Sequence, residues 1–109
     1  MYIPDKGDIV TLNFDPSAGR EIMKRRPAFV ISRKIFNEHT GFAVVAPITS
    51  TSRNMKLEVL LPDSLSIQGS VLIHQVKSLD FDGRDMSFVE KAPQAITDEV
   101  TNMVKVIIS

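Results

Sequence analysis

The chain has 109 residues, of which 43% are hydrophobic and 24% are charged, and it contains no cysteine. This size and composition predict one folded domain, residues 1–109, and exclude a disordered chain. The 13 Lys and Arg residues balance 13 Asp and Glu residues, and the lack of cysteine excludes disulfides and thiol catalysis. Because no apolar run could span a bilayer and no signal pattern opens the chain, we expect a cytoplasmic protein without membrane contact.

Short apolar stretches separated by turn residues predict a mainly β chain. Residues 10–14 alternate between apolar and polar side chains, as a strand with one buried face does. Pro27 cannot donate a hydrogen bond to a ladder, so we expect it to begin the second strand, residues 28–32. Further strands are predicted at residues 42–46, 57–61, 71–73, 76–79 and 88–89. Residues 36–41 are predicted as a turn and residues 63–66 as a helical turn.

The C-terminal segment has a different pattern, which predicts a helix. Pro93 suits the first helical turn, and the apolar residues after it recur at spacings of three and four. These residues are Ile96, Val100, Met103, Val104 and Ile107. Several short strands followed by one amphipathic helix favour a small, strongly curved barrel or two packed sheets.

The charges are distributed unevenly along the chain. Residues 20–56 contain eight basic and two acidic side chains, and the rest of the chain carries the opposite excess. This asymmetry favours an anionic ligand for one face, although solvation of two loops is an equally open explanation. His39 and His74 lie in different segments without carboxylates at ligand spacing, so we expect no metal site.

Arg26 and Thr49 stand out as candidates for chemistry. Arg26 precedes one predicted strand and Thr49 follows another, and strand ends converge in a small barrel. A guanidinium binds phosphate through two parallel hydrogen bonds and stays charged at any working pH. A hydroxyl beside it could orient a phosphate or a reacting group. Residue type alone leaves structural roles open for both side chains.

The sequence resembles the MazF/PemK/Kid family of toxin endoribonucleases over nearly its whole length. The resemblance is carried, in order, by residues 7–10, 14–21, 26–32, 45–49 and 75–80. It implies an SH3-like barrel with a C-terminal helix, assembled as a homodimer. It also implies metal-independent, sequence-specific cleavage of single-stranded RNA, often messenger RNA, with no cofactor. In that chemistry the ribose 2′-hydroxyl attacks the adjacent phosphodiester, leaving a 2′,3′-cyclic phosphate and a 5′-hydroxyl. A cognate antitoxin would neutralise this inhibitor of translation.

The resemblance assigns the catalytic pair to Arg26 and Thr49. Arg26 would stabilise the charge that develops on phosphorus, and Thr49 would orient the phosphate and the attacking hydroxyl. Some members carry a carboxylate where this chain has His74, which leaves proton transfer, RNA contact or a structural role open for the imidazole. Expected RNA contacts are Arg20, Glu21, Lys24, Arg25, Ser50, Arg53, Lys56, Gln75 and Lys77.

Two alternatives use the same fold without catalysis. One is an inhibitory binding protein similar to the CcdB gyrase poisons, and the other is an RNA-binding barrel. Fold alone does not separate them, because one fold supports several functions. The Arg26–Thr49 pair favours the nuclease, since a gyrase binder has no need of a phosphate-cleaving pair.

Overall fold

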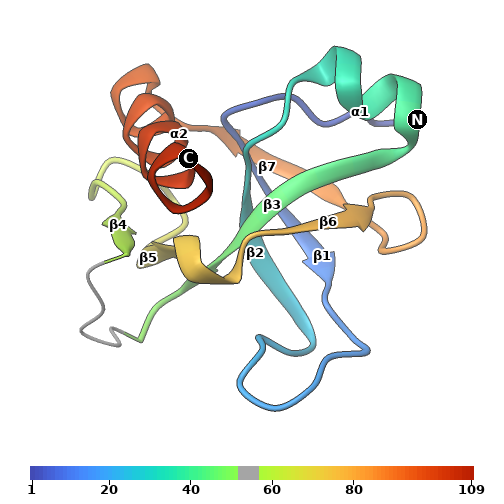
Figure 1. The fold of residues 1–109 in the computed structure, drawn as a ribbon, viewed down its shortest axis with the longest axis horizontal. Coiled ribbons are helices and arrows are strands. Elements are labelled where there is room, and N and C mark those ends of the chain that lie inside the picture. The colour runs from blue at the N-terminus through green and yellow to red at the C-terminus, as the bar shows by residue number, and fades with distance from the viewer. Residues whose placement is uncertain (52–56) are drawn as a thin grey trace.

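The computed structural model describes residues 1–51 and 57–109, in which seven strands are joined by short helices and loops and followed by a long helix (Figure 1). In chain order the elements are β1 (Asp8–Asn13), β2 (Arg25–Val30), α1 (Lys34–Thr40), β3 (Phe42–Thr49), β4 (Glu58–Leu60), β5 (Ser70–Leu72), the 3₁₀-helix η1 (Ile73–Gln75), β6 (Lys77–Asp80), β7 (Ser87–Lys91) and α2 (Gln94–Ile108). The predicted mainly β fold with a C-terminal helix is therefore confirmed.

The strands form one antiparallel sheet organised around β3. The order is β4-β5-β3-β2-β1-β7, and β6 pairs with β3 outside this path. One edge of β3 pairs with β2, while the other pairs first with β6, from Phe42 to Val45, and then with β5, at Ile48 and Thr49. Because β3 exchanges neighbours halfway along its length, the sheet bends, as it does in a small barrel.

The two faces of the sheet bury two apolar clusters. Alternation along β1 and β2 sends Ile9 and Phe29 into one cluster, and Val10 and Ala28 into the other. The first cluster lies against α2, whose Val100 has no exposed surface. The second includes Ile22 from the β1–β2 loop, so this loop is anchored to the core.

Helix α2 confirms the predicted C-terminal helix. Pro93 lies at the N-cap position, one residue before the helix, with φ of −58°. No acidic side chain lies in the first turn, because Asp98 and Glu99 come one turn later. Among the described residues, no helix has both the length and the apolar character that a membrane span requires.

Two predictions near β2 are wrong. Residues 36–41, predicted as a turn, lie largely in α1, whose only buried residue is Asn37. The Asn37 amide donates to the carbonyl oxygens of Pro4, at 2.7 Å, and Ser32, at 3.1 Å. These partners come from tertiary structure, so no apolar periodicity could indicate this helix.

Strand β2 begins at Arg25, not at residue 28, and Pro27 lies inside it opposite Thr11. The ladder with β3 begins only at Ala28. Pro27 therefore interrupts no hydrogen bond with β3, which is the condition for proline within a strand.

The loop between β4 and β5 is held by β7. The predicted helical turn at residues 63–66 is a single hydrogen-bonded turn, in which Leu65 N–H donates to the Pro62 carbonyl at 3.2 Å. The Glu90 carboxylate accepts hydrogen bonds from Ser66 Oγ at 2.7 Å and from the Ser66 and Ile67 N–H groups at 3.1 and 2.9 Å. These bonds lower the pKa of Glu90.

Candidate active site

The ends of β2 and β3 bring Arg26 and Thr49 to one place on the sheet. The last recorded pair of their ladder is Ala28 with Pro47. Two further residues on the same register set Arg26 opposite Thr49. Arg26 is two residues from Ala28 and Thr49 is two residues from Pro47, so each side chain points to the same side of the sheet as that neighbour. This is the side of the second core cluster, because Ala28 belongs to that cluster. The two side chains therefore emerge on the same face of the sheet, just beyond the last paired residues.

Arg26 is exposed, and one bond fixes the base of its guanidinium. Its Nε donates to the Met23 carbonyl oxygen at 3.2 Å, and its backbone pairs with Leu12 of β1. Within residues 1–51 and 57–109, no other hydrogen bond or ion pair to Arg26 is recorded. The terminal nitrogens are therefore available to a phosphate, which a guanidinium binds with two parallel hydrogen bonds.

Thr49 is half-buried at the end of β3, and its neighbours fix its backbone. Its Oγ1 accepts a hydrogen bond from the Thr51 N–H at 3.2 Å, and its backbone pairs with Ser70 of β5. Gly69 lies directly against it, because a Cβ at Gly69 would stand 2.1 Å from the Thr49 carbonyl oxygen. Gly69 also has a φ of +122°, which only glycine adopts readily.

A polar cavity of about 190 Å³ lies around η1 and the start of β6. Lys77, one of its lining residues, pairs with Val45 of β3, which faces the second core cluster, so Lys77 lies on the same face of the sheet. Its lining residues are Glu21, His74, Gln75, Val76 and Lys77. His74 is exposed, and its Nε2 lies 3.5 Å from the Gln75 side-chain nitrogen. The Lys77 ammonium lies 5.9 Å from the centroid of the Phe14 ring, below the β1–β2 loop. Four of the expected site residues are therefore gathered at one cavity.

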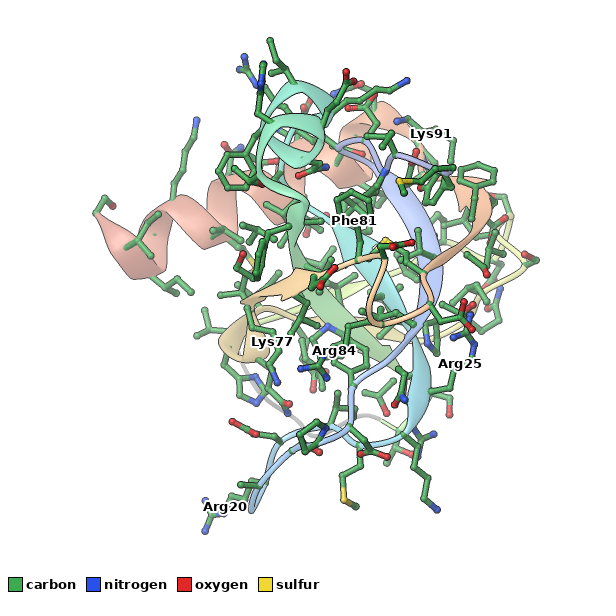
Figure 2. The ribbon with its side chains drawn as sticks, turned by 90° about the vertical axis from the view of Figure 1, so that its right-hand side faces the viewer. Arg20, Arg25, Lys77, Phe81, Arg84 and Lys91 are labelled. Atoms are coloured by element: carbon green, nitrogen blue, oxygen red, sulfur yellow. The ribbon has the colours of Figure 1, made fainter. Side chains whose placement is uncertain are left out.

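The loop of residues 14–24 projects from the sheet and carries Arg20 at its far end (Figures 1 and 2). Its root is closed by the Phe14 N–H, which donates to the Lys24 carbonyl at 2.9 Å, and by the Lys24 N–H, which donates to Asp15 Oδ1 at 2.9 Å. From the β6–β7 loop, Arg84 Nη1 donates to the Asp15 carbonyl at 2.6 Å. Sequence reasoning missed Arg84 and Gly69, since neither belongs to a recognisable motif.

Arg25 lies apart from this group of residues. Consecutive strand residues face opposite sides, and Arg25 Nη2 donates to Thr11 Oγ1 at 3.1 Å and to Ser87 Oγ at 3.3 Å. Figure 2 shows Arg25 on the β1 side, away from Lys77 and Arg20. Ser50 is exposed beside Thr49. The remaining expected contacts, Arg53 and Lys56, lie outside the described residues. In the described part of the chain, no group of three or more His, Asp and Glu side chains could hold a metal ion.

The sequence also matches a family model. Residues 5–108 match the model of the PemK-like, MazF-like toxin of type II toxin–antitoxin systems. The chain belongs to this family. The suspected family resemblance is thereby confirmed, and the chain is a MazF-like toxin.

Characterised relatives and solved structures agree with this membership. The chain is 37% identical over 83 residues to the endoribonuclease toxin MazF of Escherichia coli K12, covering 76% of this chain and 74% of the relative. The crystal structure of MazF from Deinococcus radiodurans superimposes with a TM-score of 0.94 at 37% identity, covering 99% of this chain and 98% of that one. A MazE–MazF structure from the same organism gives a TM-score of 0.86 at 33% identity, covering 99% and 97% of the two chains. These MazF structures share the fold of the present chain.

Proposed function

We propose that this MazF-like toxin is a sequence-specific, metal-independent endoribonuclease that cleaves single-stranded RNA through attack by a ribose 2′-hydroxyl. The observation that supports the proposal is the register of β2 and β3, in which Ala28 pairs with Pro47. Continued by two residues along each strand, this register would set Arg26 opposite Thr49. The 14–24 loop carries Arg20 and Lys24, and its Glu21 lines the polar cavity. The related MazF of E. coli is named an endoribonuclease toxin, which supports the same activity.

Arg26 stabilises the transition state by charge. The 2′-hydroxyl gives its proton to solvent water or another base as its oxygen bonds to phosphorus, which becomes five-coordinate and places more negative charge on its non-bridging oxygens. The bond from phosphorus to the 5′-oxygen then breaks. A guanidinium held at its base by Met23 faces that charge with little reorganisation, so it stabilises the transition state more than the substrate. A guanidinium stays protonated at any working pH, so Arg26 cannot serve as the general base. Arg26 therefore serves as an electrostatic group and as a proton donor to the leaving 5′-oxygen.

Thr49 orients the phosphate and the attacking hydroxyl. Its Oγ1 already accepts the Thr51 N–H, so its own hydroxyl proton is available to a phosphate oxygen. In RNA cleavage of this type, alignment of the 2′-oxygen with the phosphorus and the leaving oxygen is a large part of the barrier. The close packing of Gly69 against Thr49 supports this alignment.

RNA lies across the face that carries Arg26, along the cavity and the 14–24 loop. Arg20, Lys24 and Lys77 bind backbone phosphates there, and Glu21, Ser50 and His74 lie where unstacked bases can be reached. Arg25 faces the other way, so we leave it out of this surface. The products are a 2′,3′-cyclic phosphate and a 5′-hydroxyl, and translation stops because messenger RNA is cut.

A cognate antitoxin and a second copy of the chain are the proposed protein partners. The Deinococcus MazF structure with MazE is a complex of this kind, and a partner segment with acidic side chains would complement Arg20, Lys24 and Arg26. Helix α2 lies beside β4 (Figure 1). For the homodimer, both elements expose apolar side chains. These are Leu60, Val106, Ile107 and Ile108.

The proposal is tested by incubating the purified protein with a long single-stranded RNA in EDTA. We expect cleavage at a recurring short sequence, and we expect Arg26→Ala to abolish it while circular dichroism and the melting temperature stay near wild type. Arg33→Ala is the matched control, because Arg33 is an exposed arginine at the N-cap of α1, away from the Arg26–Thr49 pair. Retardation of the RNA without cleavage would support the RNA-binding barrel instead, and cleavage only with added magnesium would contradict the mechanism.

A further inference from the structure

The Gln75 side chain joins two parts of the molecule that are far apart in sequence. It belongs to η1 and is half-buried. Its Oε1 accepts a hydrogen bond from the Ile22 N–H at 2.8 Å, across 53 residues of sequence. Its Nε2 lies 3.5 Å from the Arg20 carbonyl oxygen. Both polar atoms of Gln75 are therefore directed at the backbone of the 14–24 loop.

The end of this loop is internally ordered. The Glu21 N–H donates to the Ala18 carbonyl at 3.1 Å, and the Ala18 N–H donates to Glu21 Oε1 at 2.9 Å. Residues 18–21 thus form a turn closed by two hydrogen bonds. This turn carries Arg20, whose side chain lies at the far end of the molecule in Figure 2.

Within residues 1–51 and 57–109, only a few contacts join this turn to the body of the protein. Arg84 and the Phe14–Lys24 pair hold the root of the loop, several residues away. Near the turn, Ile22 is buried in the second core cluster with 7% exposure, and Gln75 binds the backbone on either side of Glu21. Burial of the Ile22 side chain holds the turn against the core. The hydrogen bonds to Gln75 are directional, so they set how the turn is rotated about Ile22.

We infer that Gln75 is a positioning residue, which sets the 14–24 loop against η1 and so places Arg20 for phosphate binding. This inference rests on the proposed RNA-cleaving function, and it replaces the expected direct contact of Gln75 with RNA. Because Gln75 also lines the cavity between Glu21 and Lys77, the same bonds set the width of that cavity. Gln75 acts on RNA through the loop.

The first test measures amide hydrogen exchange of the RNA-free protein. Gln75→Met keeps the length of the side chain and removes both hydrogen bonds, so exchange at the Ile22 N–H should accelerate about fivefold or more. Gln75→Glu keeps an oxygen acceptor and should restore most of the protection. Gln94→Met is the control, because Gln94 is exposed on α2 and bonds only to Asp98 among the described residues.

The second test measures binding of a 2′-O-methyl RNA, which has no free 2′-hydroxyl, at several salt concentrations. If Gln75→Met misplaces the loop, the salt dependence should become shallower, by about 0.7 in the slope of log K against log salt for each lost phosphate contact. The melting temperature should stay near wild type, and Gln94→Met should leave the slope unchanged. A purely structural role would leave the slope unchanged in Gln75→Met as well, and would overturn the inference.

The two tests separate the inference from the proposed function. Weakened RNA binding by Gln75→Met with unchanged exchange at Ile22 would show direct contact with RNA and overturn the positioning role. If the wild type failed to bind the RNA, the proposed function would be overturned, and exchange at Ile22 would still decide whether Gln75 holds the loop.

Discussion

Arg25 and Arg26 are exposed neighbours in β2, yet they differ in the face of the sheet they occupy and in the hydrogen bonds of their guanidinium groups. The Arg25 guanidinium donates hydrogen bonds to Thr11 and Ser87, and it lies 4.0 Å from the Asp85 carboxylate. Arg26 is bound only through Nε among the described residues and faces the cavity side of the sheet. The alternation of a strand thus turns two adjacent cations toward two separate surfaces.

Arg25→Ala is therefore expected to retain the RNA-cleavage rate of the wild type. The substitution removes exposed hydrogen bonds, so the free energy of unfolding should fall by no more than about 1 kcal/mol. Single-turnover cleavage and thermal melting, measured beside Arg26→Ala, check both statements. A loss of cleavage as large as that of Arg26→Ala would mean that RNA also reaches the opposite face.

For single residues, the sequence was enough to select candidate catalytic side chains, but it did not indicate the hydrogen bonds between distant segments. Arg26 and Thr49 could be selected because they match the motifs of a known family. The bond between Gln75 and Ile22 could not be predicted, since nothing in either segment signals a partner 53 residues away. Gly69 was missed for a similar reason, because its role depends on the backbone that lies against it in the folded chain.

The elements that hold the site are β2, β3, β5 and η1, and the backbone of Gly69, just before β5, lies against Thr49. Gly69 precedes β5, and Ser70 pairs with Thr49. Any side chain at Gly69 would displace the end of β3, because the nearest atoms are backbone atoms of Thr49 and Ser50. The position of Thr49 therefore depends on a residue that does no chemistry.

Gly69→Ala is expected to destabilise the protein and to reduce cleavage. The alanine must adopt a φ near +122° and also clash with the Thr49 carbonyl, and backbone strain of this kind costs about 1–3 kcal/mol even without a clash. Gly41→Ala is the control, since Gly41 also has a positive φ, +75°, but has no atom within 4 Å of an added Cβ. Thermal melting should show the larger loss for Gly69→Ala. Equal losses would contradict the role given to the Thr49 contact.

The helices show where sequence patterns succeed. Helix α2 packs against an apolar cluster through Ile96, Val100 and Val104, so its burial is visible as a helical period. Helix α1 buries Asn37 and leaves Ile35 and Phe36 exposed at 67% and 44%. The buried side of α1 is polar and hydrogen-bonded, so the apolar pattern of a helix is absent. The turn-forming residues of this segment therefore led to the prediction of a turn.

For the molecule as a whole, the zero net charge conceals an uneven distribution of charge along the chain. The basic excess of residues 20–56 is found partly on the loop and strand end that face the cavity, where Arg20, Lys24 and Arg26 lie. The acidic excess belongs to the rest of the chain. Under the proposed function, the cations of Arg20, Lys24 and Arg26 would attract the RNA backbone.

A homodimer is the expected assembly, because α2 and β4 expose four large apolar side chains, Leu60, Val106, Ile107 and Ile108, between 38% and 75% of their surface. Sedimentation at micromolar concentration should give the mass of two chains. Val106→Asp, which places a charge among these side chains, should shift the protein toward monomers, whereas Glu38→Asp on α1 should not. A wild type that sediments as one chain would contradict the dimer.

In the proposed mechanism, a 2′-hydroxyl aligned by Thr49 attacks the phosphate and cuts the RNA, while Arg26 stabilises the negative charge that develops. The most direct measurement uses the RNA site mapped with the wild-type protein, resynthesised with a single 2′-deoxynucleotide on the 5′ side of the scissile phosphate. In EDTA, the unmodified RNA should yield a 2′,3′-cyclic phosphate and a 5′-hydroxyl, and the modified RNA should remain intact while binding equally well. Cleavage of the modified RNA at the same phosphate would contradict the account.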